Sequence, residues 1–129
     1  MAIVKQFTAM LENRPGSLAE LCSELAKVAV NISAIHQSDL RPVAPVRLVV
    51  SHPEAARKVF GAMKLKHTEE DVLAVKVGDR PGALGRITRK LAEHNINVEY
   101  AYGSISRGAT QALIILQVSD LERAARLLR

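Results

Sequence analysis

The sequence is poor in aromatic residues and cysteine, and it contains no long apolar run. Two Phe, two Tyr and no Trp make up 3% of its 129 residues, whereas hydrophobic residues reach 48%. A core must therefore be built from Val, Ile, Leu and Ala. The single cysteine, Cys22, excludes an internal disulfide framework. The N-terminus lacks a signal-peptide pattern and no segment approaches the roughly 18 apolar residues of a membrane helix, so we expect a cytoplasmic protein without membrane contact.

Catalytic and metal-binding motifs are also missing. The four histidines are scattered, and none has a second ligand at metal spacing. Paired carboxylates, a catalytic triad and a phosphate-binding loop are not visible, and Gly78-x-x-x-Gly82-x-x-Gly85 lacks the spacing of a dinucleotide-binding motif. We therefore predict a protein without catalytic activity, bound metal or cofactor.

An internal repeat organises the chain. Residues 7–63 align with residues 73–129 at an offset of 66 without a gap. The identical pairs are Arg14/Arg80, Pro15/Pro81, Gly16/Gly82, Leu18/Leu84, Leu25/Leu91, Ala26/Ala92, Asn31/Asn97, Ser38/Ser104, Arg41/Arg107 and Arg57/Arg123. Most of them lie in the first half of the repeat, which indicates one duplicated structural unit.

The first repeat predicts the order β-α-β-β-α, followed by a short strand. Alternating apolar positions indicate strands and the helical spacing of Leu18, Leu21 and Leu25 indicates a helix. We expect strands at 3–11, 30–34, 46–50 and 65–68, helices at 15–29 and from 53, and a hairpin loop at 41–45, where two prolines argue against a central strand.

The second repeat predicts the same order without the closing strand. We expect strands at 73–77, 96–102 and 112–118 and a turn at 103–108. Leu84, Ile87 and Leu91 line an expected helix that ends near residues 94–95, and a second helix begins at 120. Ser119 or Asp120 is a candidate N-cap, and Ser17-x-x-Glu20 resembles a capping box. Seven strands are thus predicted where two complete units would have eight. The second unit is left with an open sheet edge, or another chain covers it.

The motif that carries most of the information is a strand-to-helix turn present twice. Asn13-Arg14-Pro15-Gly16-Ser17-Leu18 and Asp79-Arg80-Pro81-Gly82-Ala83-Leu84 each follow an apolar strand and open an amphipathic helix. A helix N-terminus presents unpaired N–H donors and partial positive charge, which suit a carboxylate. Glycine at the turn allows a ligand to approach the backbone closely.

With this motif and the repeat, the sequence resembles a tandem pair of ACT domains. The resemblance implies an α+β protein with two ferredoxin-like βαββαβ units, residues 1–70 and 71–129. Each unit would have an antiparallel sheet with helices packed on one face, and the second would lack its last strand. ACT domains usually bind an amino acid where two units pack together, with the turn clasping the polar groups of the ligand. The implied ligand-binding residues are Asn13, Arg14, Gly16, Ser17, Leu18, Asn31, Ile32, Asp79, Arg80, Gly82, Ala83, Leu84, Asn97 and Val98.

The two turns differ at their first position. A carboxylate at Asp79 can pair with an α-ammonium through a charge-assisted hydrogen bond, which is stronger than the bond that the amide of Asn13 can make. We therefore expect the second turn to be the better amino-acid site. The alternative is that Arg-Pro-Gly serves packing alone, and for Asn31 and Asn97 the alternative is a helix C-terminal role.

Nucleic-acid binding is the rival function for a basic βαββαβ protein. The net charge is +5, but basic residues are spread among acids without a block of like charge. RNA-binding modules of this fold stack bases on aromatic residues of the central strands. Here the only aromatic residue in those strands is Phe7, and the alternation of apolar positions assigns it to the core. We predict a regulatory or sensor protein that binds a small amino acid, forms a homodimer and binds no nucleic acid. The alternative is a subunit that binds a partner enzyme without a small-molecule ligand.

Overall fold

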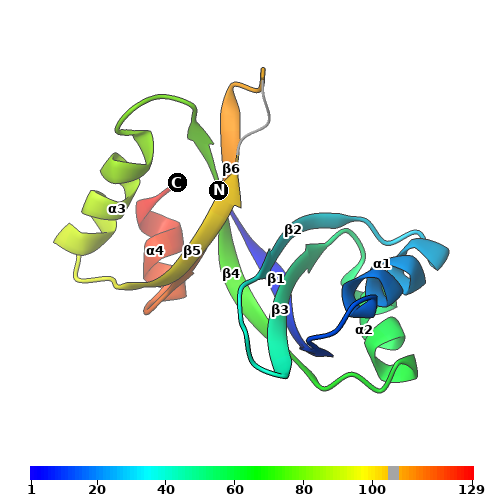
Figure 1. Ribbon diagram of the computed structural model, residues 1–129. Coiled ribbons are helices and arrows are strands. Elements are labelled where there is room, and N and C mark those ends of the chain that lie inside the picture. Colours follow the sequence, from blue (N-terminus) through cyan, green and yellow to red (C-terminus); the bar gives the residue numbers. More distant parts are fainter. Residues whose placement is uncertain (105–107) are drawn as a thin grey trace. The chain divides into compact units, whose positions relative to one another are not determined.

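The computed structural model describes residues 1–104 and 108–129 (Figure 1). In this part of the chain the elements are β1 (Ala2–Glu12), α1 (Ser17–Lys27), β2 (Ile32–Gln37), β3 (Val43–Val50), α2 (Pro53–Ala62), β4 (His67–Gly78), α3 (Ala83–Glu93), β5 (Val98–Ser104), β6 (Gln111–Val118) and α4 (Leu121–Leu127). The predicted turn at 103–108 includes residues 105–107, which lie outside the described residues. Within the described ranges, no helix is long and apolar enough to cross a membrane.

The chain divides into two compact units. The first unit is Lys5–Glu70, and the second unit is Met1–Val4 together with Asp71–Arg129. The strands β1 and β4 therefore contribute residues to both units. The sequence-based range 1–70 assigned residues 1–4 to the first repeat, whereas in the structure they pack with the second unit. The reason is the length of β1, whose first residues extend beyond the first unit.

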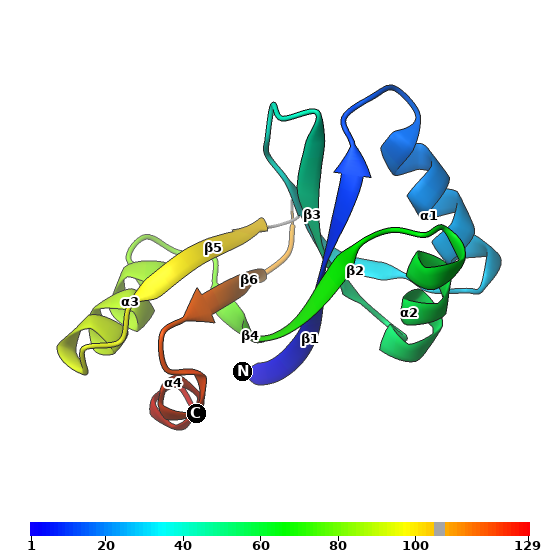
Figure 2. The same ribbon diagram turned by 90° about the horizontal axis from the view of Figure 1, so that it is seen from below.

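The first unit is an antiparallel sheet covered by two helices. Its strand order is β2-β3-β1-β4, with Phe7 opposite Leu48 where β1 pairs with β3. Helices α1 and α2 lie on one side of the sheet (Figures 1 and 2). Phe7 meets Phe60 of α2 edge to face at 5.1 Å in an otherwise aliphatic core. This is the ferredoxin-like α+β arrangement that the sequence predicts.

The second unit repeats the arrangement but takes one strand from the N-terminus. Its order is β1-β4-β6-β5, where β1 contributes its first residues, 2–4. Buried residues from β4, α3, β6 and α4 form its core: Leu73, Leu91, Leu116 and Ala124 are fully buried. The predicted open edge was wrong, because Met1–Val4 occupy the position of the missing strand.

Strand β4 joins two segments that the sequence separates. The prediction gave strands at 65–68 and 73–77, with an acidic stretch between them. In the structure β4 runs unbroken from His67 to Gly78. The carboxylates of this stretch have partners: Glu69 pairs with Arg57, and Glu70 accepts hydrogen bonds from Gln6 and Thr8. These contacts hold the acidic residues in an extended strand.

The repeat changes register within its hairpin. Phe7 and Leu73 are 66 residues apart, but their strand partners Leu48 and Leu116 are 68 apart. The β5–β6 hairpin is therefore two residues longer than the β2–β3 hairpin, and the ungapped alignment was wrong beyond it. The corrected register brings into equivalence the identical pairs Leu48/Leu116, Val50/Val118, Ser51/Ser119 and Ala56/Ala124. Arg57 and Arg123 are not equivalent, and Arg107 lies outside the described residues.

Proline 45 lies within a central strand, contrary to the predicted loop at 41–45. It pairs with Met10 of β1, whereas the pairs between β2 and β3 end at Gln37 and Val46. At this position β3 is therefore paired with β1 but not with β2. Proline 45 lacks an N–H group, and no hydrogen bond to a neighbouring strand is lost as a result. Strand β3 can consequently start at Val43.

Candidate functional site

The two strand-to-helix turns have the same backbone. Gly16 and Gly82 are the N-cap residues of α1 and α3, and both are left-handed, with φ of 87° and 86°. In each turn the arginine N–H donates to the carbonyl two residues earlier, at 3.0 Å. Glycine tolerates this conformation without a Cβ clash. The duplicated sequence motif therefore encodes a duplicated local structure.

Neither helix is capped by a side chain. The predicted capping box was wrong: Ser17 is buried, and Glu20 accepts hydrogen bonds from the Arg14 guanidinium. The Ser17 and Ala83 N–H groups donate to Arg14 O and Arg80 O at 3.3 and 3.2 Å. The N–H donors that follow them in the first turn of each helix are available for a ligand or water. Each helix start thus has the partial positive charge of a helix N-terminus, which favours an anion.

The side chains around the first turn form an ion-pair cluster. Arg14 Nε donates to Glu12 at 2.8 Å, and Nη2 donates to Glu20 at 3.2 Å. These hydrogen bonds, the one to Glu12 first, raise the pKa of the guanidinium above its ordinary value. The three groups together carry one net negative charge, so the first turn is acidic.

The second turn has the opposite charge. Gly78 and Arg86 stand where the first repeat has Glu12 and Glu20. A Cβ built on Gly78 would lie 3.9 Å from Arg80 Cζ, and one on Gly82 would lie 3.7 Å from Arg86 Nη1. The two guanidinium groups thus lie close to the turn, and within the described residues neither forms an ion pair.

Asp79 and Asn13 occupy the same backbone position. The Asn13 N–H donates to Pro42 O at 2.8 Å, and the Asp79 N–H donates to Thr110 O at 3.0 Å. Both side chains are exposed. The carboxylate of Asp79 therefore adds an acceptor for an ammonium group beside the two arginines of the second turn.

Leu18, Ala83 and Leu84 lie in the first turns of α1 and α3, whereas the remaining four predicted residues lie beyond the C-terminal ends of these helices. Asn31 and Ile32 follow α1, an 11-residue helix that spans about 16 Å, so the first unit does not bring them next to its own turn. The same separation holds for Asn97 and Val98. Ile32 and Val98 each pack against the core of their unit.

The backbones of these asparagines are fixed by serines that the sequence reading missed. The Asn31 N–H donates to Ser51 Oγ at 2.9 Å, and the Ser51 N–H donates back to Asn31 O. Asn97 and Ser119 make the same two bonds. The signal was present, because Ser51 and Ser119 become equivalent once the two-residue shift is included.

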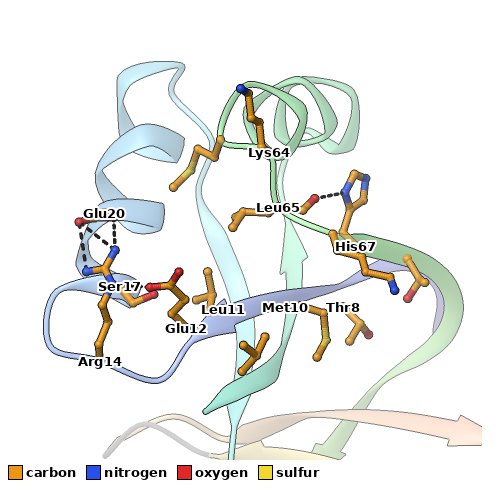
Figure 3. A pocket seen from close by; sticks show the side chains of 14 residues that line it. Thr8, Met10, Leu11, Glu12, Arg14, Ser17, Glu20, Lys64, Leu65 and His67 are labelled. Carbon is orange, nitrogen blue, oxygen red and sulfur yellow. Dashed lines mark hydrogen bonds and ion pairs between the residues drawn. The ribbon is translucent and has the colours of Figure 1, made fainter. Parts of the chain in front are cut away.

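A pocket of about 730 Å³ lies in the first unit beside the first turn (Figure 3). It is lined by Thr8, Met10, Leu11, Glu12, Arg14, Ser17, Glu20, Val43, Met63, Lys64, Leu65, Lys66, His67 and Thr68. The Arg14 ion pairs lie at one side and His67 lies at the other. Of the predicted residues, only Arg14 and Ser17 line it. The connection between α2 and β4 was missed, since nothing in its sequence indicates that it faces the turn.

Metal binding receives no support from the side-chain arrangement. In the portion of the chain that the structure describes, no group of three His, Cys, Asp or Glu side chains could hold a metal ion.

Comparison with known proteins agrees with this geometry. Residues 72–129 match the family model described as ACT domain. Over 98% of this chain, the structure is similar to protein BT0572 from Bacteroides thetaiotaomicron, with 26% identity, a TM-score of 0.90 and 86% of that chain covered. It is also similar to the ligand-free regulatory subunit of aspartate kinase from Thermus thermophilus, with 16% identity, a TM-score of 0.68, and 98% and 95% of the two chains covered. Among curated proteins, none matches.

The segment that matches the ACT domain model contains the Asp79–Leu84 turn and is similar to that family over its whole length. The likeness to the aspartate kinase subunit extends over nearly the whole chain and concerns the fold.

Proposed function

We propose that this chain is a non-catalytic regulatory protein built from two ACT units, which binds a small amino acid at its strand-to-helix turns. The observation that carries the proposal is the pair of uncapped helix starts with left-handed glycines, one of them in the ACT domain. Side chains at the Asn31/Ile32 and Asn97/Val98 positions of an adjoining ACT unit would complete each pocket.

The second turn is proposed as the stronger site. The α-carboxylate of the ligand would accept hydrogen bonds from the start of α3, beside Arg80 and Arg86. The α-ammonium would donate to Asp79, a charge-assisted bond for which Asn13 offers only an amide. This pose uses both charges of an amino acid and leaves its side chain to set specificity.

Calorimetry with the amino acid identified by a thermal-shift screen tests this proposal. Asp79→Ala should weaken binding by about 10-fold or more, because a hydrogen bond to a charged group contributes about 1.5–3 kcal/mol. Asn13→Ala should weaken it much less. Equal losses for both variants, or no loss for Asp79→Ala, would overturn the assignment of the second turn.

Regulation would follow from linkage between ligand binding and association. A ligand held across two ACT units stabilises their contact, and it thereby changes which surface is available to a partner. We propose a cytoplasmic homodimer as the working state. Sedimentation of the protein with and without ligand tests this, and a strictly monomeric profile in both would contradict it.

The second candidate is a regulatory subunit that binds a partner enzyme without a small-molecule ligand. It is favoured by the first turn, where Glu12 and Glu20 already pair with the arginine that would meet a ligand carboxylate. Thermal-shift measurements across the twenty amino acids separate the candidates. Absence of stabilisation at millimolar concentration would favour the ligand-free subunit.

A further inference from the structure

We propose that the first unit binds a second copy of this chain by reciprocal insertion of the loop at residues 38–42 into the pocket beside the first turn. In this arrangement Leu40 of each copy lies on the apolar floor of the other copy's pocket. The inference rests on the proposed homodimer, for which it names the contact surface. It involves neither the second turn nor an amino-acid ligand.

Leu40 is the most exposed large apolar side chain in the described part of the chain. It is 97% exposed, whereas the other exposed large hydrophobic residues there do not exceed 49%. It lies in the loop between β2 and β3. A single exposed apolar residue on its own marks no interface. Here, however, the loop is held by hydrogen bonds and lies beside a pocket.

Hydrogen bonds within the loop hold Leu40 in place. The Arg41 backbone N–H donates to Asp39 Oδ1 at 2.9 Å, and Arg41 Nε donates to Asp39 Oδ2 at 2.8 Å. Pro42 O accepts a hydrogen bond from the Asn13 N–H at 2.8 Å, which ties the end of the loop to the first turn. A loop that is already ordered loses less conformational entropy when it binds. Leu40 is therefore presented on a preformed loop.

The loop and the pocket lie at the same end of the first unit. Val43 is the first residue of β3 after the loop, and it also lines the pocket. Its strand partner is Glu12, the last residue of β1, so the β2–β3 loop and the β1–α1 turn share this end (Figure 2). Each copy thus carries the inserted group and the receiving pocket close together. A twofold axis between two copies then lets each loop enter the other pocket, which gives a closed dimer.

The pocket can receive an apolar side chain. Its volume of about 730 Å³ exceeds that of one leucine side chain, so neighbouring residues of the loop also fit. Met10, Met63 and Leu65 line it and are only half-buried, and Figure 3 shows Met10 and Leu65 on its walls. Contact of these side chains with Leu40 removes apolar surface from water on both copies. Methionine side chains are flexible and adapt to an inserted group.

The charges of the loop complement those around the pocket. The ion-pair cluster of the first turn carries one net negative charge at one end of the pocket. On the other side Lys64 and Lys66 are exposed, and among the described residues neither forms an ion pair. The inserted loop carries Asp39 and Arg41, two residues apart. Arg41 toward the acidic end and Asp39 toward the lysines give favourable contacts on both sides, which fixes the orientation of insertion.

Sedimentation equilibrium of the full chain tests this contact. Leu40→Asp should lower the association constant at least about 100-fold, because two apolar side chains leave the interface of each dimer. Leu40→Met should stay within about fivefold of wild type, since it keeps the apolar volume. Ser38→Asp is the matched control, because it adds the same charge at another exposed position of the loop, and it should also stay within about fivefold.

Methionine methyl groups report occupation of the pocket. Met10 and Met63 line it, whereas Met1 belongs to the second unit. Dilution of protein labelled with ¹³C at the methionine methyl groups should shift the Met10 and Met63 signals and leave Met1 unchanged. In a mixture of one sample labelled at methionine methyls and another labelled at leucine methyls, cross-peaks from Leu40 to Met10 or Met63 arise only between copies. We expect these cross-peaks in the wild-type mixture.

Three outcomes would overturn the inference. If Leu40→Asp associates as strongly as wild type, the dimer uses another surface, and the proposed homodimer stands without this contact. If cross-peaks from Leu40 to Met10 occur in protein labelled at both methyl types but not in the mixture, the loop enters its own pocket. A wild type that is monomeric at millimolar concentration would contradict both this contact and the homodimer, whereas calorimetry measures amino-acid binding at the second turn separately.

Discussion

Glycine is needed at the two helix starts for its backbone conformation, whereas Gly85 inside α3 has no such role. Gly82 is left-handed at φ 86°, whereas a Cβ built on Gly85, about one turn further along α3, would have no other heavy atom within 4 Å. The conformation of Gly82 is unfavourable for any residue with a Cβ. The two positions therefore respond oppositely to the same substitution.

Gly82→Ala should lower the free energy of unfolding by about 1–2 kcal/mol, the cost of a left-handed non-glycine residue. Gly85→Ala should raise it by up to about 1 kcal/mol, because alanine loses less entropy in a helix. Urea denaturation of both variants checks this. Equal effects of the same sign would show that the backbone conformation of Gly82 does not matter.

An exposed ion pair links α2 to β4. Both nitrogens Nε and Nη2 of Arg57 lie 2.7 Å from Glu69, and this pairing holds the pKa of Glu69 below its ordinary value of 4.5. A carboxylate with a lowered pKa in the folded state stabilises the protein above its unfolded pKa, and that contribution is lost as the pH falls through the folded pKa.

Wild type should therefore lose more stability between pH 6 and pH 3 than the Glu69→Gln variant does. The free energy of unfolding of the two proteins, measured by urea denaturation at both pH values, should differ more at pH 6. Glu93→Gln serves as the control, since Glu93 forms no ion pair within the described ranges. A constant difference between wild type and Glu69→Gln at the two pH values would contradict the pairing.

At the residue scale, the sequence predicted features that depend on neighbours in the chain. The N-cap role of Asp120 is confirmed, since it accepts a hydrogen bond from the Arg123 N–H at 3.2 Å. The capping box at Ser17 failed because Glu20 instead pairs with Arg14. This partner comes from the turn before the helix, and the sequence pattern does not encode the direction of its side chain.

At the scale of elements, hydrogen bonds from two serines fix where β2 and β5 begin. Ser51 and Ser119 follow β3 and β6. Their hydroxyl oxygens accept hydrogen bonds from the N–H groups of Asn31 and Asn97 at 2.9 Å. Each serine thus ties the end of one strand to the start of its neighbour.

Ser51→Ala and Ser119→Ala should each destabilise the protein by about 0.5–1.5 kcal/mol, the net value of such a bond. Ser33→Ala is the matched control, because Ser33 is an exposed strand residue without a hydrogen bond of its side chain in the described part of the chain. Thermal unfolding of the three variants measures the difference. A loss in Ser33→Ala as large as in the other two would argue against the role of the serine bonds.

Most helices and strands could be predicted because their apolar periodicity is strong. The connections between them and the register of the strands could not be predicted. The acidic stretch inside β4 resembles a linker until Arg57, Gln6 and Thr8 are seen to bind it. The two-residue shift in the second hairpin was not predicted, because the ungapped alignment already contained coincidental identities such as Arg57/Arg123. The pocket could not be predicted at all, since it depends on where β4 leaves the edge of β1.

At the scale of the whole molecule, the second unit depends on the N-terminus. Met1–Val4 complete its sheet beside β4, although about 70 residues separate them from that strand in sequence. Deletion of residues 2–4 should therefore weaken the second unit and affect the first unit less.

Amide hydrogen exchange tests this dependence. In the deletion variant, protection should fall in Leu73–Val77 of β4, where an edge becomes unpaired, and should persist in the β1–β3 pairs around Phe7 and Leu48. Unchanged protection of Leu73–Val77 would show that residues 2–4 contribute nothing to the second unit.

The sharing of β1 and β4 also has a consequence for synthesis on the ribosome. Domains generally fold as their residues emerge, from the N-terminus onward. Here Met1–Val4 leave the ribosome before the first unit, Lys5–Glu70, whereas their strand partner in β4 and the remainder of their unit, Asp71–Arg129, leave after it. The first unit likewise lacks its edge strand until residues 67–70 have appeared. The nascent chain must therefore keep the start of β1 unpaired while residues 5–70 are translated, and this segment is where early contacts with chaperones or with other nascent chains are expected.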